Sequence, residues 1–112
     1  MPTEFGRLGR DLPMRSQSKS WRQYQQDLID AYYDARMHEI LDPLYEAFGQ
    51  WKRGDIKHND LTELIHKVYQ ENQRVYNFFT QSRRQIISFI KLDSDWFTTW
   101  LRDNPAPPGM EL

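Results

Sequence analysis

The sequence predicts an all-α protein built around a long antiparallel hairpin of two helices, followed by a short C-terminal helix. Apolar residues recur every three to four positions along two long segments. A short polar stretch, residues 52–59, separates these segments. The 112 residues suffice for one domain. We divide the chain into an extended basic arm (1–16), a helical hairpin domain (17–103) and a proline-rich tail (104–112).

The arm shows no helical periodicity, and glycine and proline interrupt it at Pro2, Gly6, Gly9 and Pro13. Residues 1–22 carry five basic and two acidic side chains, a net charge of +3, whereas the remainder carries ten basic and fourteen acidic ones, a net charge of −4. A basic arm on a mildly acidic body favours docking to an anionic partner or to a neighbouring copy. Arg7 and Arg10 are its candidate contacts.

The first long helix is expected from Ser18. At ~100° per residue, its apolar stripe contains Ile29, Tyr33, Ile40, Leu44, Ala47 and Trp51. Asp42 and Pro43 form a good N-cap and first-turn pair, so we expect either a kink or a fresh helix there. Leu41, Tyr45 and Phe48 then widen the apolar face, and Gly54 ends the segment.

The second long helix is expected from Asp60, which with Glu63 places acidic side chains at the positive end of the helix dipole. Its stripe contains Leu61, Ile65, Val68, Val75, Phe79, Ile86 and Ile90. No glycine or proline occurs before Asp93, so the prediction is one continuous helix of about 32 residues, or ~48 Å. Two helices of similar length joined by a short loop pair antiparallel.

The last helix is expected after Asp93-Ser94-Asp95, which supplies its cap, and it ends at Asn104-Pro105. Trp96, Phe97, Trp100 and Leu101 form its apolar face. We expect this face to fold back on one end of the hairpin, with the tail extended in a polyproline conformation.

Aromatic residues make up 14% of the chain, which is more ring surface than the thin core of a small domain easily covers. Scattered aromatics can also be ordinary half-exposed core. We expect apolar flanks on both sides of the hairpin: Trp21, Leu28 and Tyr32 on one, and Leu41, Tyr45 and Phe48 on the other. A second copy or a larger partner would complete it to a bundle. The candidate partner-binding residues are Tyr45, Phe48, Trp51, Trp96 and Trp100, with Arg7 and Arg10.

The expected function is therefore that of a non-catalytic protein–protein interaction module, such as an adaptor, an assembly factor or a small subunit of a larger complex. Polar residues within the stripes, Arg36, Asn72 and Arg83, either meet a carboxylate or carbonyl of another chain or reach past the stripe edge to water. No enzyme is expected, because the chain has no Cys, no Gly-x-Ser-x-Gly and no phosphate-binding loop.

Two alternatives come from other classes of protein. Glu63 and His66 have the Glu-x-x-His spacing of helical metal sites, and Asp30, Asp34 and His38 lie one turn apart on the other helix. These groups point away from the stripes, so we expect neither metal nor cofactor. Basic side chains at 52–57, 83–84 and 91 could contact nucleic acid, but the hairpin separates them. No apolar run reaches the ~18 residues of a membrane span, and the cytoplasm is the default compartment.

Overall fold

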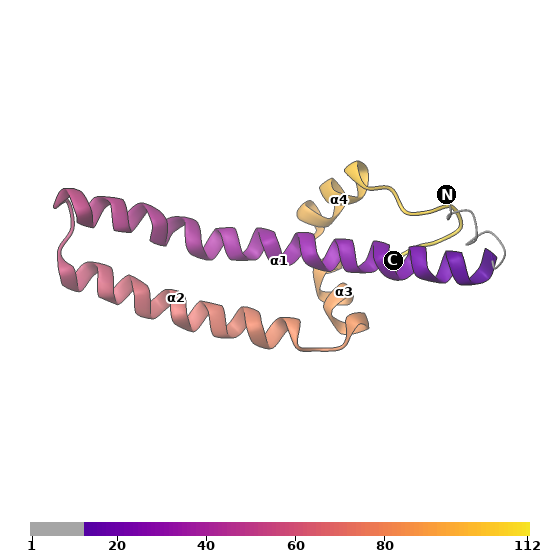
Figure 1. The fold of residues 1–112 in the computed structure, drawn as a ribbon, viewed down its shortest axis with the longest axis horizontal. Helices are drawn as coiled ribbons and strands as arrows, with labels where there is room; N and C mark the ends of the chain where they lie inside the picture. Colours follow the sequence, from indigo (N-terminus) through magenta and orange to yellow (C-terminus); the bar gives the residue numbers. More distant parts are fainter. Residues whose placement is uncertain (1–12) are drawn as a thin grey trace, which may run out of the picture. The chain divides into compact units, whose positions relative to one another are not determined.

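The computed structural model describes residues 13–112, with side chains from Ser20 onward. Over this range the chain forms four helices and no strands, which confirms the predicted all-α class (Figure 1). The helices are α1 (Pro13–Arg53), α2 (His58–Phe79), α3 (Arg83–Leu92) and α4 (Ser94–Asp103). They divide between two compact units. Unit 2 is residues 30–86, and the described part of unit 1 is residues 13–29 and 87–112.

Unit 2 is the predicted helical hairpin, in which α2 runs antiparallel to the second part of α1 (Figure 1). Ring contacts hold the two helices together at both ends. Near the connection, the rings of Trp51 and His58 lie 6.0 Å apart between centroids. At the other end, Tyr33 meets Phe79 edge-on at 5.1 Å. The predicted antiparallel pairing is therefore confirmed.

The core of the hairpin is drawn from the predicted stripes, although two of their members, Tyr33 and Ile65, are exposed. Its buried side chains are Ile40, Ala47, Leu61 and Val75. Full burial of one such aliphatic side chain contributes roughly 1.5–3 kcal/mol. Because short isolated helices are marginal in water, this shared burial is what stabilises the two helices as a pair.

The connection between α1 and α2 ends one helix and begins the next within four residues. Gly54, at φ 85°, allows a left-handed turn in which Gly54 N–H donates to Trp51 O and Asp55 N–H donates to Gln50 O. The helix α2 then starts at His58, two residues before the predicted Asp60. Asp60 still acts at this terminus, because its carboxylate accepts the Lys57 N–H at 3.0 Å.

Both prolines of α1 fall inside the helix bounds. Pro43 lies within one continuous helix, so the fresh helix that was one of the two expected outcomes at this position does not form. Pro13 is the first helical residue, a position where its missing N–H costs nothing. The helix therefore includes residues 13–16, and the prediction that the extended arm reaches residue 16 is wrong.

The prediction of one continuous second helix is wrong, because the chain breaks at residues 80–82 between α2 and α3. Ser82 and Gln85 form a reciprocal cap at the start of α3. The Gln85 N–H donates to Ser82 Oγ at 3.2 Å, and the Ser82 N–H donates to Gln85 Oε1 at 3.3 Å. Thr80 closes α2, with its hydroxyl donating to the carbonyl oxygen of Asn77 at 2.9 Å.

Unit 1 packs the first part of α1 with α3, α4 and the tail. Leu28 and Ile90 are completely buried at its centre, so the prediction that Leu28 lies on an exposed flank is wrong. The Tyr24 ring lies 5.3 Å from that of Trp100. Its hydroxyl donates to the carbonyl oxygen of Asn104 at 2.6 Å, and burial raises the pKa of this hydroxyl. The last helix therefore folds back onto α1, as expected of its apolar face.

The tail after α4 is held at one further point. The Lys91 ammonium donates to the carbonyl oxygen of Leu112 at 3.0 Å. Within residues 13–112, every helix is too short or too polar to cross a bilayer.

Candidate interaction surface of the hairpin

Large apolar and aromatic side chains are exposed along the hairpin. Of the nine such residues in the described part of the chain, seven belong to unit 2: Tyr33, Leu41, Tyr45, Phe48, Ile65, Tyr69 and Tyr76. Tyr45 is 77% exposed, Tyr76 64% and Tyr69 60%. Exposed apolar residues scattered singly need no explanation, so their arrangement decides whether they form a site.

The seven residues lie on the same flank of their helices. On α1, at ~100° of rotation about the helix axis per residue, Leu41, Tyr45 and Phe48 lie within ~120° of Tyr33. All three are rotated from Tyr33 in the same direction. On α2, Ile65, Tyr69 and Tyr76 lie within ~40° of one another about the helix axis. They are all rotated in one direction from Leu61, which is buried. In an antiparallel pair of facing helices, equivalent flanks lie on the same side of the pair. The seven therefore share one face of the hairpin, here called the apolar face.

Two surface hollows support this assignment. One is lined by Tyr33 of α1 together with Asn72 and Tyr76 of α2. The other, of about 430 Å³, is lined by Tyr32 and Arg36 of α1 with Glu71, Arg74, Val75, Phe78 and Phe79 of α2. The helix positions place the first hollow on the apolar face and the second on the opposite face.

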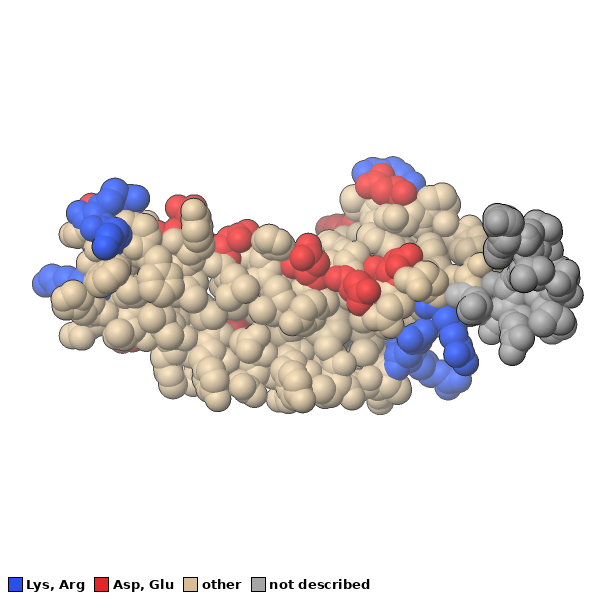
Figure 2. All heavy atoms as spheres, in the orientation of Figure 1, with Lys and Arg blue, Asp and Glu red and all other residues tan. Residues whose placement is uncertain are grey.

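The apolar face runs most of the length of the hairpin. The ring contacts at its two ends set the alignment of α1 with α2. Between them, Tyr45 stands level with Ile65, and Leu41 stands level with Tyr69. From Phe48 to the level of Tyr33 the strip is ~22 Å long at 1.5 Å per residue. Uncharged side chains cover the middle of the hairpin in Figure 2, and basic ones gather where α1 connects to α2.

The opposite face carries charged side chains paired within their own helices. The Arg36 guanidinium donates to Glu39 at 2.6 Å, and Arg74 pairs with Glu71. Such exposed pairs contribute at most ~1 kcal/mol each. Their presence nevertheless makes the two faces chemically different.

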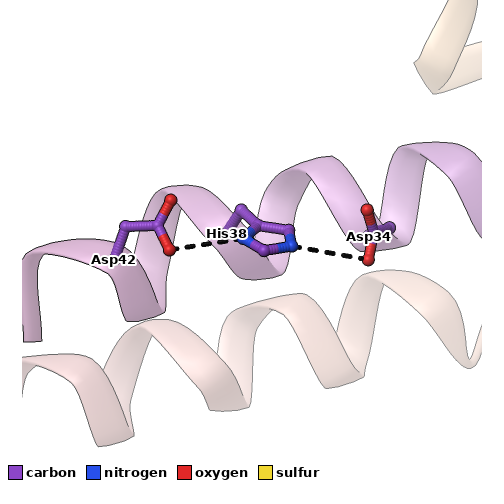
Figure 3. Close-up of polar contacts among 3 residues, drawn as sticks. All are labelled: Asp34, His38 and Asp42. Atoms are coloured by element: carbon purple, nitrogen blue, oxygen red, sulfur yellow. Dashed lines mark hydrogen bonds and ion pairs between the residues drawn. The ribbon is translucent and has the colours of Figure 1, made fainter. Parts of the chain in front are cut away.

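At the edge of the apolar face, His38 lies between two carboxylates one turn away on either side (Figure 3). Its Nδ1 is 3.3 Å from Asp42 Oδ1 and its Nε2 is 3.8 Å from Asp34 Oδ1. The hydrogen bond and charge of Asp42, and then the charge of Asp34, raise the pKa of this imidazole. All three side chains are well exposed, so the arrangement is a surface ion-pair chain.

The predicted partner-binding residues that the structure describes divide between the two units. Tyr45 and Phe48 lie together on the apolar face. Trp51 is half-buried at the hairpin connection, where its indole N–H donates to His58 Nδ1 at 2.9 Å. Trp96 and Trp100 are half-buried in unit 1, with stacked rings 6.5 Å apart. The remaining two, Arg7 and Arg10, lie outside the described residues.

The groups considered for metal binding face water, as their helix positions predict. Asp30, Asp34, His38, Glu63 and His66 are all exposed. Within residues 13–112, no three His, Cys, Asp or Glu side chains meet in an arrangement that could hold a metal ion. The polar residues of the stripes are not buried either, because the core of the described chain contains no polar or charged side chain. Arg36, Asn72 and Arg83 are therefore at least partly exposed, as either expected role requires.

Sequence reasoning missed the contribution of α2 to the apolar face. The predicted stripe of the second helix contains Ile65 as a buried residue, and it contains neither Tyr69 nor Tyr76. A signal was present, because all three lie ~40–80° to the same side of Leu61 while Leu64 and Val75 lie to the other. Because α2 runs antiparallel to α1, the residues rotated in this direction lie on the same side of the hairpin as Tyr45.

Comparison with known proteins adds no assignment. No family model matches the sequence, and neither a curated protein nor a solved structure matches it. The function is therefore inferred from the chemistry of the surface.

Proposed function

We propose that this chain is a non-catalytic protein–protein interaction module, and that the apolar face of the hairpin is its binding surface. It would serve as an adaptor, an assembly factor or a small subunit of a larger complex. The observation that carries the proposal is the segregation of exposed side chains: all seven large exposed apolar residues of unit 2 share one face.

The size and composition of the apolar face fit this role. A strip ~22 Å long and two helices, or ~20 Å, wide covers about 450 Å² before its corrugation is counted. This area is in the range of the largest patch on a typical monomer, which is often functional. Tyrosine supplies a large apolar area with a polar hydroxyl, a combination enriched at interfaces.

The proposal is tested by site-specific photo-crosslinking in the native source. A benzophenone amino acid replaces Tyr45 or Tyr69, and the matched control places it at Glu46 or Lys67, which are exposed on other flanks of the same helices. We expect protein adducts from the first pair and few from the second. Adducts only from Glu46 and Lys67, or from none of the four positions, would contradict the proposal.

No specific observation favours the metal-binding or nucleic-acid alternatives over this one. The cytoplasm remains the expected compartment, as a prediction from the sequence.

A further inference from the structure

We infer that the occupant of the apolar face is a second copy of the same chain, packed face to face and antiparallel, so that two hairpins form a four-helix bundle. This inference rests on the proposed function, because it uses the same surface. A two-fold axis parallel to the line from α1 to α2 would place each α1 against the partner's α1 and each α2 against the partner's α2. All neighbouring helices would then run antiparallel, as in an up-and-down bundle.

Four of the seven side chains of the apolar face, Leu41, Tyr45, Ile65 and Tyr69, are self-complementary about that axis. An axis at the level of Pro43 places Leu41 of one copy opposite Tyr45 of the other. On α2 the same level lies midway between Ile65 and Tyr69, so these two also face each other across the axis. One two-fold axis therefore brings an apolar pair together on α1 and another on α2, at the same level along the hairpin. A surface that binds an unrelated partner does not need this symmetry.

The charges at the ends of the apolar face obey the same symmetry. Asp34 and Lys52 lie on the flank that carries Tyr45, at opposite ends of the strip and equally far from Pro43 along the helix. The Asp34 side chain is 76% exposed. In the antiparallel arrangement, Asp34 of each copy meets Lys52 of the other, twice per dimer. A parallel arrangement would instead bring like charges together at each end, which disfavours it.

The available area is close to what a specific dimer needs. From Asp34 to Lys52 the surface extends ~27 Å, and with its two-helix width it covers roughly 550 Å² in projection. Corrugation of side chains increases the accessible area above the projected value. A standard interface buries ~800 Å² on each partner, so this surface supports an interface at the small end of the specific size range.

The test measures molar mass by light scattering across a dilution series of the full chain. We expect a monomer–dimer equilibrium in the wild type. Tyr45→Glu should raise the dimer dissociation constant about 100-fold or more, because a carboxylate would be buried in the interface twice. The matched control, Glu46→Lys, lies on another flank and should leave the constant unchanged. Both residues are exposed, and circular dichroism verifies that the variants fold.

A charge exchange tests the register. Asp34→Lys alone and Lys52→Asp alone should each weaken the dimer about tenfold. The double variant should restore wild-type dissociation within a few-fold, because each reversed charge meets its reversed partner. A dimer that Tyr45→Glu weakens but the double variant does not restore would overturn the antiparallel arrangement.

The molar mass also separates this inference from the proposed function. A wild type that stays monomeric at all concentrations would overturn the second copy as occupant. Crosslinks from Tyr45 to a different protein would then still support the proposed function, whereas a monomer without crosslinks would refute both.

Discussion

Replacing Ser82 with alanine distinguishes the observed break between α2 and α3 from a continuous helix. The two cases predict changes of opposite sign in the free energy of unfolding. In the structure, Ser82 Oγ accepts the N–H of Gln85, and Gln85 in turn accepts the N–H of Ser82. Loss of such an N-cap costs ~1 kcal/mol. If the helix instead continued through this position, alanine would be the better helix former and would stabilise the protein by ~0.5 kcal/mol. Ser82 is exposed, so packing adds no comparable contribution.

The assay is urea and thermal unfolding followed by circular dichroism. A destabilisation of ~1 kcal/mol should lower the Tm by about 4–6 °C in a chain of this size. Amide exchange at Gln85 and Ile86, the first residues that donate to Ser82, should also accelerate. The matched control is Ser88→Ala at an exposed position inside α3, where we expect slight stabilisation. An increase in stability for Ser82→Ala, equal to that of the control, would refute the observed break.

Two further predictions concern the core and a surface ion-pair chain. Leu28→Ala should lower the free energy of unfolding by ~2–5 kcal/mol in urea titrations, because the side chain is completely buried. The control Leu92→Ala, at a site that is 76% exposed, should change it by at most ~0.5 kcal/mol. Equal effects of the two substitutions would contradict the assignment of Leu28 to the core. The pKa of His38 should exceed its ordinary 6.5 in an NMR titration, and Asp42→Asn should lower it. Because the folded-state pKa is the higher one, the stabilisation from this group should be fully present below the unfolded-state pKa and decline as pH rises through the folded value. An unshifted titration would contradict the contacts of Figure 3.

The periodicity of apolar residues was sufficient to predict the hairpin and its core. Ile40, Ala47, Leu61 and Val75 were expected in the stripes, and all four are buried. The extent of the helices was harder to predict. Pro43 disfavours a helix interior locally, but burial of Ile40 and Ala47 on either side holds the helix through it.

The break after α2 was predictable from a signal that the apolar stripe concealed. Ser82-x-x-Gln85 matches the capping-box pattern, yet Phe79, Ile86 and Ile90 continue the helical spacing through it. The spacing of apolar residues indicates which face of a helix is apolar, but it does not indicate whether the helix is continuous. The capping residues should therefore have decided the boundary.

The candidate site was only partly predictable for a related reason. Tyr45 and Phe48 were identified because they lie at the edge of their stripe. Ile65 lies nearer the centre of its own stripe, and whether such a side chain is covered depends on which helix packs over it. That information becomes available only once α1 and α2 are placed side by side.

Fluorine NMR with fluorotyrosine measures binding at the apolar face itself, because three of its seven side chains are the exposed tyrosines Tyr45, Tyr69 and Tyr76. If the apolar face binds another protein chain, the resonances of all three should shift together as the protein is concentrated, or as its binding protein is added. Tyr24, which is buried in unit 1, should stay constant as an internal reference. Binding that shifts only Tyr24, with the three exposed tyrosines unchanged, would contradict binding at the apolar face.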